Sequence, residues 1–352
     1  MGNNTSITEH KRHYYRELLC IGVPIIIGQL GTIILGFADT LMIGHHSTEE
    51  LAAAGLVNNI ITFILVSYMG FSYGLTPIIG KLYGMEKTDK IGQKVKNSFF
   101  ANMVVGVIFS LALIILYFNL HRIGQPEELL ALIRPYFIVN LISVLFVGVF
   151  NTLKQFLDGI GNTKVAMWVM IMGNIVNIFG NWVLIYGVGP CPEMGLLGAG
   201  ISTLASRVLM AVAMVGIIAG TKEYREYRNN IIASRINGAD FREMNRLGWP
   251  VALQLALESG AFTLSCVMVG WLGTIPLAAH QVMITISQLF YLVLSGMAAA
   301  LAIRVSHFVG QNDFAAVRRN AYDGWRLNLL FSLCMGIPVL LLRHQIGGWF
   351  ND

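Results

Sequence analysis

The chain has 352 residues, of which 55% are hydrophobic and only 12% are Asp, Glu, Lys or Arg. Soluble domains carry about 25% charged residues, so this composition excludes an ordinary soluble protein and predicts an all-α integral membrane protein. The formal net charge is +5. The basic residues lie mainly between apolar segments, as in membrane proteins generally, so the charge does not indicate a nucleic-acid partner.

Nine apolar segments follow one another along the chain, and each is close to or longer than the ~20 residues that a membrane-spanning helix needs. Charged side chains are rare inside them. We therefore expect nine spanning helices, at 18–43, 51–79, 97–118, 132–156, 165–187, 195–219, 247–270, 277–303 and 327–343.

The distribution of Lys and Arg predicts the orientation of these helices. If successive helices alternate in direction, 20 of the 24 Lys and Arg residues lie on the side of the N-terminus and three lie on the opposite side. Cytoplasmic loops of membrane proteins are enriched in Lys and Arg. The N-terminus is therefore expected to be cytoplasmic.

The chain contains an internal repeat. Residues 22–84 resemble residues 248–310 without gaps, at a constant offset of 226, and twelve of the 63 aligned positions are identical. Glycine and proline positions, such as Pro24 and Pro250, keep the same register. Two copies that start on the same side of the membrane are typical of secondary transporters built from two similar lobes.

The repeat predicts the domain organisation. We expect a cytoplasmic tail at 1–17, a first lobe of six helices at 18–220, a basic cytoplasmic linker at 221–246, and three helices of a second lobe at 247–352. The second lobe is expected to be incomplete, because a full copy of the six-helix unit would extend well beyond Asp352.

Two acidic residues lie within the apolar segments, Asp39 near the outer end of the first and Glu258 about midway along the seventh. A carboxylate at membrane depth costs ~2.5–3.5 kcal/mol on insertion scales, and it is retained where it binds a cation, takes up a proton or lines a water-filled cavity. Both are therefore candidates for ion coupling. The alternatives are a loop-edge position among headgroups for Asp39 and a purely structural role for Glu258.

Other polar residues also lie in the apolar segments. Asn174, Asn177 and Asn181 share one face of the fifth segment, and amide groups can ligate a hard cation or bond a carboxylate. Packing between helices is the alternative explanation. His280 and Gln281 begin the eighth segment and are further candidates, with an interfacial position as the alternative for His280.

Arg207 lies inside the sixth segment, where it must pair or face water. The sequence has no phosphate-binding loop, no His/Cys metal cluster and no nucleophile motif. We therefore expect neither an enzyme nor an ATP-driven pump, and no cofactor.

An ordered set of short motifs resembles the multidrug and toxic compound extrusion family, and its NorM-type branch in particular. The motifs are Pro24 and F-A-D-T-L-M-I-G at 37–44, L-A-A-A-G at 51–55, Gln155 with G-x-G-N-T-K at 159–164, N-x-x-x-N-W-V-L-I-Y-G at 177–187, Pro250 with Glu258, A-A-H-Q-V at 278–282, and I-R-V at 303–305.

The resemblance implies two lobes of six helices and antiport of cationic amphipathic compounds against Na⁺ or H⁺. It implies an ion site at Asp39 and Asn177, both candidate Na⁺ ligands, and a second acid at Glu258. Asn181 stands where the DinF-type branch tends to have an acid, which favours the NorM-type branch and Na⁺. Gln155 is a supporting candidate through its place in the motif.

The predicted function is export of small organic cations across the cell (inner) membrane by alternating access, in exchange for Na⁺ or H⁺, by a monomer in the lipid bilayer. One alternative is a lipid-linked saccharide flippase of the same superfamily, which would carry a basic central cavity. Others are a non-functional fragment and a membrane enzyme with a lipid substrate. Two membrane acids against one deep basic residue, Arg207, favour cationic cargo.

Overall fold

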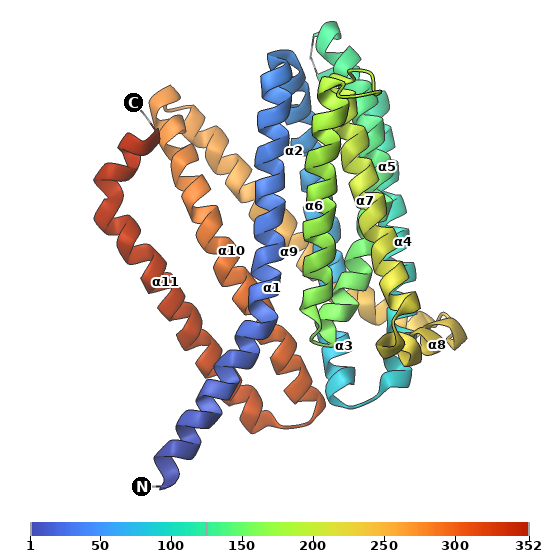
Figure 1. Ribbon diagram of the computed structural model, residues 1–352, viewed down its shortest axis with the longest axis vertical. Helices are drawn as coiled ribbons and strands as arrows, with labels where there is room; N and C mark the ends of the chain where they lie inside the picture. Colours follow the sequence, from blue (N-terminus) through green and yellow to red (C-terminus); the bar gives the residue numbers. More distant parts are fainter. Residues whose placement is uncertain (1, 124–125, 351–352) are drawn as a thin grey trace.

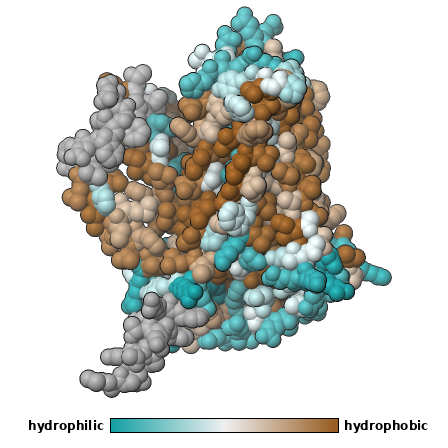
Figure 2. Space-filling view, in the orientation of Figure 1, coloured by the Kyte–Doolittle hydropathy of each residue, from teal (hydrophilic) through white to brown (hydrophobic). Residues whose placement is uncertain are grey.

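The computed structural model describes residues 2–123 and 126–350, with side chains from 15 to 341 except 123–125, 274, 277 and 278. Within this part of the chain the secondary structure is helical, and nine helices are long and apolar enough to cross a membrane. The expected all-α membrane fold is therefore confirmed. Figure 2 shows the matching surface, a broad hydrophobic band between polar ends.

The first lobe contains α1 (Gly2–His46), α2 (Thr48–Tyr73), α3 (Leu75–Gly84), α4 (Thr88–Phe118), α5 (Glu127–Gly159), α6 (Thr163–Tyr186) and α7 (Gly195–Gly220). Helix α6 packs against both α1 and α7, and α5 packs against α2, α4 and α7 (Figure 1). Most of the buried apolar side chains of these helices form one continuous core, which holds the polar residues inside the bundle in place.

Local sequence signals fix several helix ends. Ser47 caps α2, because its hydroxyl accepts hydrogen bonds from the backbone N–H groups of Glu49 and Glu50 at 3.2 and 3.4 Å. Helix α6 ends at Gly187, whose φ of +65° is a conformation that glycine adopts without strain. The second apolar segment is divided at Gly74 into α2 and α3, a break that the sequence analysis did not predict.

The second lobe contains α9 (Gly238–Gly270), α10 (Thr274–Gly310) and α11 (Phe314–Phe350). Before it, the chain forms a short 3₁₀ turn (Lys222–Tyr224) and α8 (Arg225–Ala233), which packs on α4. The start of α9 is held to α4 by Asp240, which accepts hydrogen bonds from Lys94 at 2.6 Å and Gln93 at 2.8 Å.

Most helices are longer than predicted. Helix α1 includes residues expected as a tail, α4 begins at Thr88 instead of 97, and α9 begins at Gly238, inside the expected linker. The apolar pattern marks only the stretch that meets lipid, whereas the helical hydrogen bonds continue into polar flanks. Residues 1, 351 and 352, at the ends of the expected tail and second lobe, lie outside the described residues.

We call the two ends of the molecule the basic end, which carries the connections at 85–87, 160–162, 221–237 and 311–313, and the far end, which carries those at 119–126, 187–194 and 271–273. The connections and helix ends at the basic end hold most of the Lys and Arg residues. The names describe the molecule alone and assign neither end to a side of the membrane.

The two lobes meet at the basic end in pairs related by the internal repeat. In the repeat register Gly80 corresponds to Ser306 and Gly84 to Gly310, and the members of each pair contact one another. A residue can contact its repeat-related equivalent only where the two-fold axis that relates the two repeats passes between them. The closest approach of the lobes therefore lies on the pseudo-two-fold axis, where glycine lets the backbones of α3 and α10 come together.

Contacts away from this axis come in symmetric sets. Gly70 of α2 packs against Ala252 of α9, and the equivalent residues, Gly296 of α10 and Ile26 of α1, pack against each other. Helix pairs α2–α9 and α1–α10 are thus two copies of one interface. The repeat that the sequence indicated is visible in the geometry of the lobe contact.

Towards the far end the lobes diverge (Figure 1). The far halves of α9 and α10 are exposed, with Leu257 at 65%, Trp271 at 76% and Met283 at 64% accessibility. In the most apolar stretches of α9 and α11 only 6% of residues are buried, against 28% or more in the spans of the first lobe. The two lobes are therefore in contact at the basic end and apart at the far end (Figure 1).

Candidate ion and cargo site

Asp39 lies in the far half of α1 and points at helix α6. Its carboxylate accepts a hydrogen bond of 2.5 Å from the Asn181 side-chain amide, and Asn181 in turn lies 3.1 Å from the Asn177 amide. Both asparagines are fully buried, whereas Asp39 is half-buried. The structure thus brings Asp39, Asn177 and Asn181 into one cluster, with the carboxylate as its accessible member.

The Asn177 amide can be placed in two ways, which differ in whether its nitrogen or its oxygen faces Asp39. With the nitrogen towards Asp39, it donates to Asp39 Oδ1 at 3.0 Å and the amide oxygen accepts from Thr203, but the nitrogen then lies 3.1 Å from the Asn181 nitrogen and the hydrogen bond from Asn181 is lost. In the other, the oxygen faces the Asp39 carboxylate at 3.0 Å, and two acceptors meet. The Asn177 oxygen and Asp39 Oδ1 then need a proton or a cation between them. Turning the amide would therefore convert a hydrogen-bond network into a cation ligand set.

A further oxygen is free to join this set. The Asn181 side-chain oxygen is buried and has no hydrogen-bond donor among the described residues. The Asn181 nitrogen is the atom that faces Asp39, so this oxygen joins Asp39 Oδ1 and the Asn177 oxygen only when the Asn181 amide turns as well. The three hard oxygen atoms are then of the ligand type that suits Na⁺ and other hard cations. The residues present therefore fit a cation as transported ion.

The cluster is held in position by contacts along α1 and α6. Tyr186 donates to the Met42 carbonyl at 2.8 Å at the far end, and Thr163 donates to the Ile21 carbonyl at 3.0 Å at the basic end. Asn174 packs over Gly31, where any larger residue would collide with the amide. Asn174 therefore lies one helical turn from Asn177 on α6 and faces Gly31 of α1.

Behind the cluster lie the partners of Arg207, which the sequence alone left open. Arg207 of α7 donates to the Ser143 hydroxyl of α5 at 2.5 Å, and its charge interacts with Asp39 and Tyr136. Tyr136 donates to Asn58 at 3.0 Å. These residues come from three helices that are far apart in the sequence, so no local pattern could have assembled them.

Glu258 lies elsewhere, on α9 near the point where the lobes diverge. It is half-buried, and its carboxylate lies close enough to the Tyr291 hydroxyl of α10 to interact with it electrostatically. Tyr73 of α2 lies close enough to Tyr291 to interact with it electrostatically, and Ser295 of α10 reaches Gln29 of α1 at 3.4 Å. Glu258 is therefore at the floor of the space between the lobes, separate from the Asp39 cluster.

The remaining candidates do not join either group. Gln155 lies towards the basic end of α5, where its side-chain oxygen accepts from Thr76 at 2.6 Å. His280 and Gln281 lie at the far end of α10, where Gln281 is exposed. Near Gln155 the structure reveals a buried ion pair that the sequence analysis did not consider, between Lys154 and Asp158 at 2.6 Å. Their i, i+4 spacing was the available signal.

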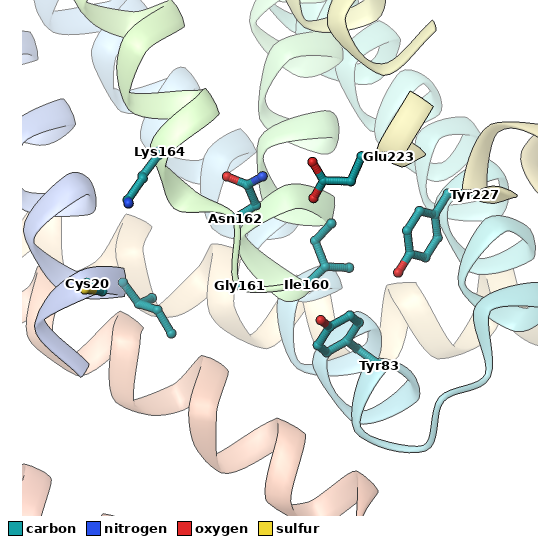
Figure 3. A pocket seen from close by; sticks show the side chains of 9 residues that line it. Cys20, Tyr83, Ile160, Gly161, Asn162, Lys164, Glu223 and Tyr227 are labelled. Carbon is teal, nitrogen blue, oxygen red and sulfur yellow. The ribbon is translucent and has the colours of Figure 1, made fainter. Parts of the chain in front are cut away.

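A hollow at the basic end has a volume of about 650 Å³ (Figure 3). It is lined in part by Tyr83, Asn162, Lys164, Glu223 and Tyr227. Burial raises the pKa of the Tyr227 phenol, which therefore stays neutral. The hollow is bounded by the linker and lies far along α1 from Asp39, so it is separate from the ion site.

A helical bundle with a half-buried carboxylate among amides, and two repeat-related lobes that open at one end, defines a secondary membrane transporter. The family model described as MatE matches residues 24–183 and 250–352. The chain therefore belongs to the MatE family, that of multidrug and toxic compound extrusion transporters, and is a transporter rather than an enzyme.

Similar proteins agree with this assignment. A probable multidrug resistance protein NorM from Photorhabdus laumondii is 31% identical over 324 residues, which are 92% of this chain and 71% of the relative. A crystal structure of MATE in complex with MaD3S superposes with a TM-score of 0.86 at 20% identity, covering 96% of this chain and 76% of that one.

Two further structures show the same fold. An outward-facing multidrug resistance MATE family transporter of the MOP superfamily has a TM-score of 0.84 at 20% identity, covering 96% and 74% of the two chains. A MOP superfamily transporter from Pyrococcus furiosus has a TM-score of 0.82, also at 20% identity and the same coverage.

Proposed function

We propose that this protein exports small organic cations by alternating access, in exchange for Na⁺ or H⁺ that binds at Asp39. The observation that carries the proposal is the Asp39 carboxylate, half-buried inside a membrane bundle and facing two buried amides. A carboxylate in that position favours the state in which a cation or proton is bound, because an uncompensated charge inside the bundle is costly. No cofactor and no second subunit is required.

In the ion-free state Asn177 and Asn181 both donate to Asp39. When a cation enters, the Asn177 amide turns and presents its oxygen, and the buried oxygen of Asn181 joins it when that amide turns as well. When a proton enters instead, the carboxyl group donates to the Asn177 oxygen. Either event changes the packing of α1 on α6, and it shifts the transport equilibrium by its differential affinity for the two states.

Cargo is expected to bind between the lobes, at Glu258. From 247 to 270 and from 279 to 303 the spans of α9 and α10 carry no Lys or Arg, and Glu258 is their single charged side chain. Arg207, the deep basic residue, bonds to Ser143 inside the first lobe and does not belong to this space. A cationic cargo therefore fits better than the pyrophosphate of a lipid-linked sugar.

The basic end is proposed to face the cytoplasm of a cell (inner) membrane, since it carries most of the Lys and Arg. The space between the lobes would then open outwards in this conformation.

The test is transport by purified protein in liposomes loaded with a fluorescent cationic dye. A Na⁺ gradient and a pH gradient are imposed separately, and dye movement is followed with each. We expect one gradient to drive dye against its own concentration difference. Dye that moves under neither gradient would rule the exchange out, and movement of a lipid-linked saccharide instead would support the flippase alternative.

Replacement of Glu258 by glutamine is expected to weaken the binding of cationic dyes about tenfold, because it removes a unit charge from a partly desolvated site. The measurement is dye affinity by fluorescence anisotropy on purified protein. Glu49→Gln serves as the control, since Glu49 is exposed at the far end of α2. Equal dye affinity in Glu258→Gln and wild type would place the cargo elsewhere.

A further inference from the structure

Arg207 is a cation inside the first lobe with no obvious structural task. It interrupts the uncharged helix α7, and it donates to Ser143, which is itself fully buried and donates to the Asn140 carbonyl at 2.6 Å. Arginine keeps its charge in proteins, and a charge at membrane depth is costly. A hydrogen bond to one hydroxyl group does not offset that cost, so another group must stabilise the guanidinium.

The group that does so is Asp39. The two charges interact, but among the described residues Arg207 forms no ion pair within 4.0 Å. They are connected through Asn177, which contacts Asp39 and also lies 3.4 Å from the hydroxyl of Ser206, the residue before Arg207. Tyr136 is the other titratable side chain that faces both. The guanidinium therefore acts on Asp39 electrostatically from beyond ion-pair distance, without occupying its ion site.

The charges inside the first lobe add up simply. Lys154 and Asp158 pair with each other at 2.6 Å and cancel. Asp39 and Arg207 are the remaining deep charges of its described spans, so the lobe interior is neutral when Asp39 is ionised and empty. When Na⁺ or H⁺ binds at Asp39, the interior carries a net charge of +1.

We propose that Arg207 is the fixed counter-charge that converts ion binding at Asp39 into repulsion of cationic cargo. This inference rests on the proposed exchange and gives it a physical cause. The ion-free lobe tolerates a cationic cargo beside it, whereas the loaded lobe repels it through the low-dielectric bundle. Without Arg207 the empty lobe would carry −1 and the loaded lobe would be neutral, so ion binding would still weaken cargo binding but the loaded lobe would no longer repel the cargo.

The charge of the lobe can be set by mutation without adding any ion. The net charge of the lobe interior is −1 in Arg207→Gln and +1 in Asp39→Asn. It is zero in the wild type and in the double variant Asp39→Asn/Arg207→Gln. At an effective dielectric constant of ~20, a unit charge about 12 Å away changes cation affinity about tenfold. The affinity for a cationic dye should therefore follow the order of these charges.

The experiment measures dye affinity for all four proteins, purified, at alkaline pH in Na⁺-free buffer. We expect Arg207→Gln to bind the cationic dye about tenfold more tightly than wild type, Asp39→Asn about tenfold more weakly, and the double variant as the wild type does. An uncharged analogue of the dye should bind all four alike. A structural role for Arg207 would lower binding of both dyes and would not be reversed in the double variant.

The outcomes separate the two proposals. A wild-type protein that does not bind the cationic dye contradicts the proposed function. A wild type that binds it, with affinities that do not follow lobe charge, overturns only the role of Arg207. Should Arg207→Gln not fold, Asp39→Asn and the double variant still decide: equal affinities in these two would overturn the inference.

Discussion

Replacing Asp39 by asparagine is expected to reduce ion-driven dye efflux to below about one tenth of the wild-type rate. Asparagine has nearly the same shape and can still bond Asn181, but it has no charge to hold Na⁺ and no site for a proton. The interior would keep its packing and lose its response to the ion gradient. The measurement is efflux under imposed Na⁺ and pH gradients, with protein quantity determined in the same membranes.

Glu49→Gln is the matched control for this experiment, because it removes a carboxylate that is exposed at the far end. It should transport as the wild type does. Ion-driven efflux that persists in Asp39→Asn, with normal protein quantity, would show that Asp39 is not the coupling group.

Replacing Gly84 by valine is expected to separate the lobes at the basic end. A side chain on Gly84 would meet the backbone of His307, and the facing Gly310 already touches Gly84. Backbone atoms cannot move aside as a flexible side chain can, so α3 and α10 must move apart, by roughly 2–4 Å toward ordinary helix spacing. The closed basic end could no longer form, and transport should fall below about one tenth of the wild-type rate.

The separation can be measured with spin labels at Lys87 and Asn312, in the connections that follow α3 and α10. Gly216→Val is the matched control, because Gly216 on α7 has open space around it. That variant should keep both the distance and the transport rate. An unchanged distance and rate in Gly84→Val would mean that the glycine contact does not control closure.

Composition and periodicity alone determined the class of this protein and much of its site. The number of spans, the basic ends and the repeat follow from residues that are close in the sequence, because lipid imposes one rule on every spanning helix. The same rule singles out Asp39 and Glu258, because a carboxylate is costly at membrane depth and is retained where it has a function. Helical spacing places Asn177 and Asn181 on one face, so two of the three members of the ion cluster were predictable as neighbours.

Only the tertiary structure decided which of these residues meet. Asp39 bonds to Asn181 across 142 residues of sequence, and Arg207 finds Ser143 across 64. Glu258, Gln155 and His280 looked equally polar in the sequence, yet they lie outside the Asp39 cluster. Partner choice of this kind depends on how helices rotate and cross as they pack. A charged residue in an apolar segment predicts that a partner exists, but the packing of the whole lobe determines which residue that partner is.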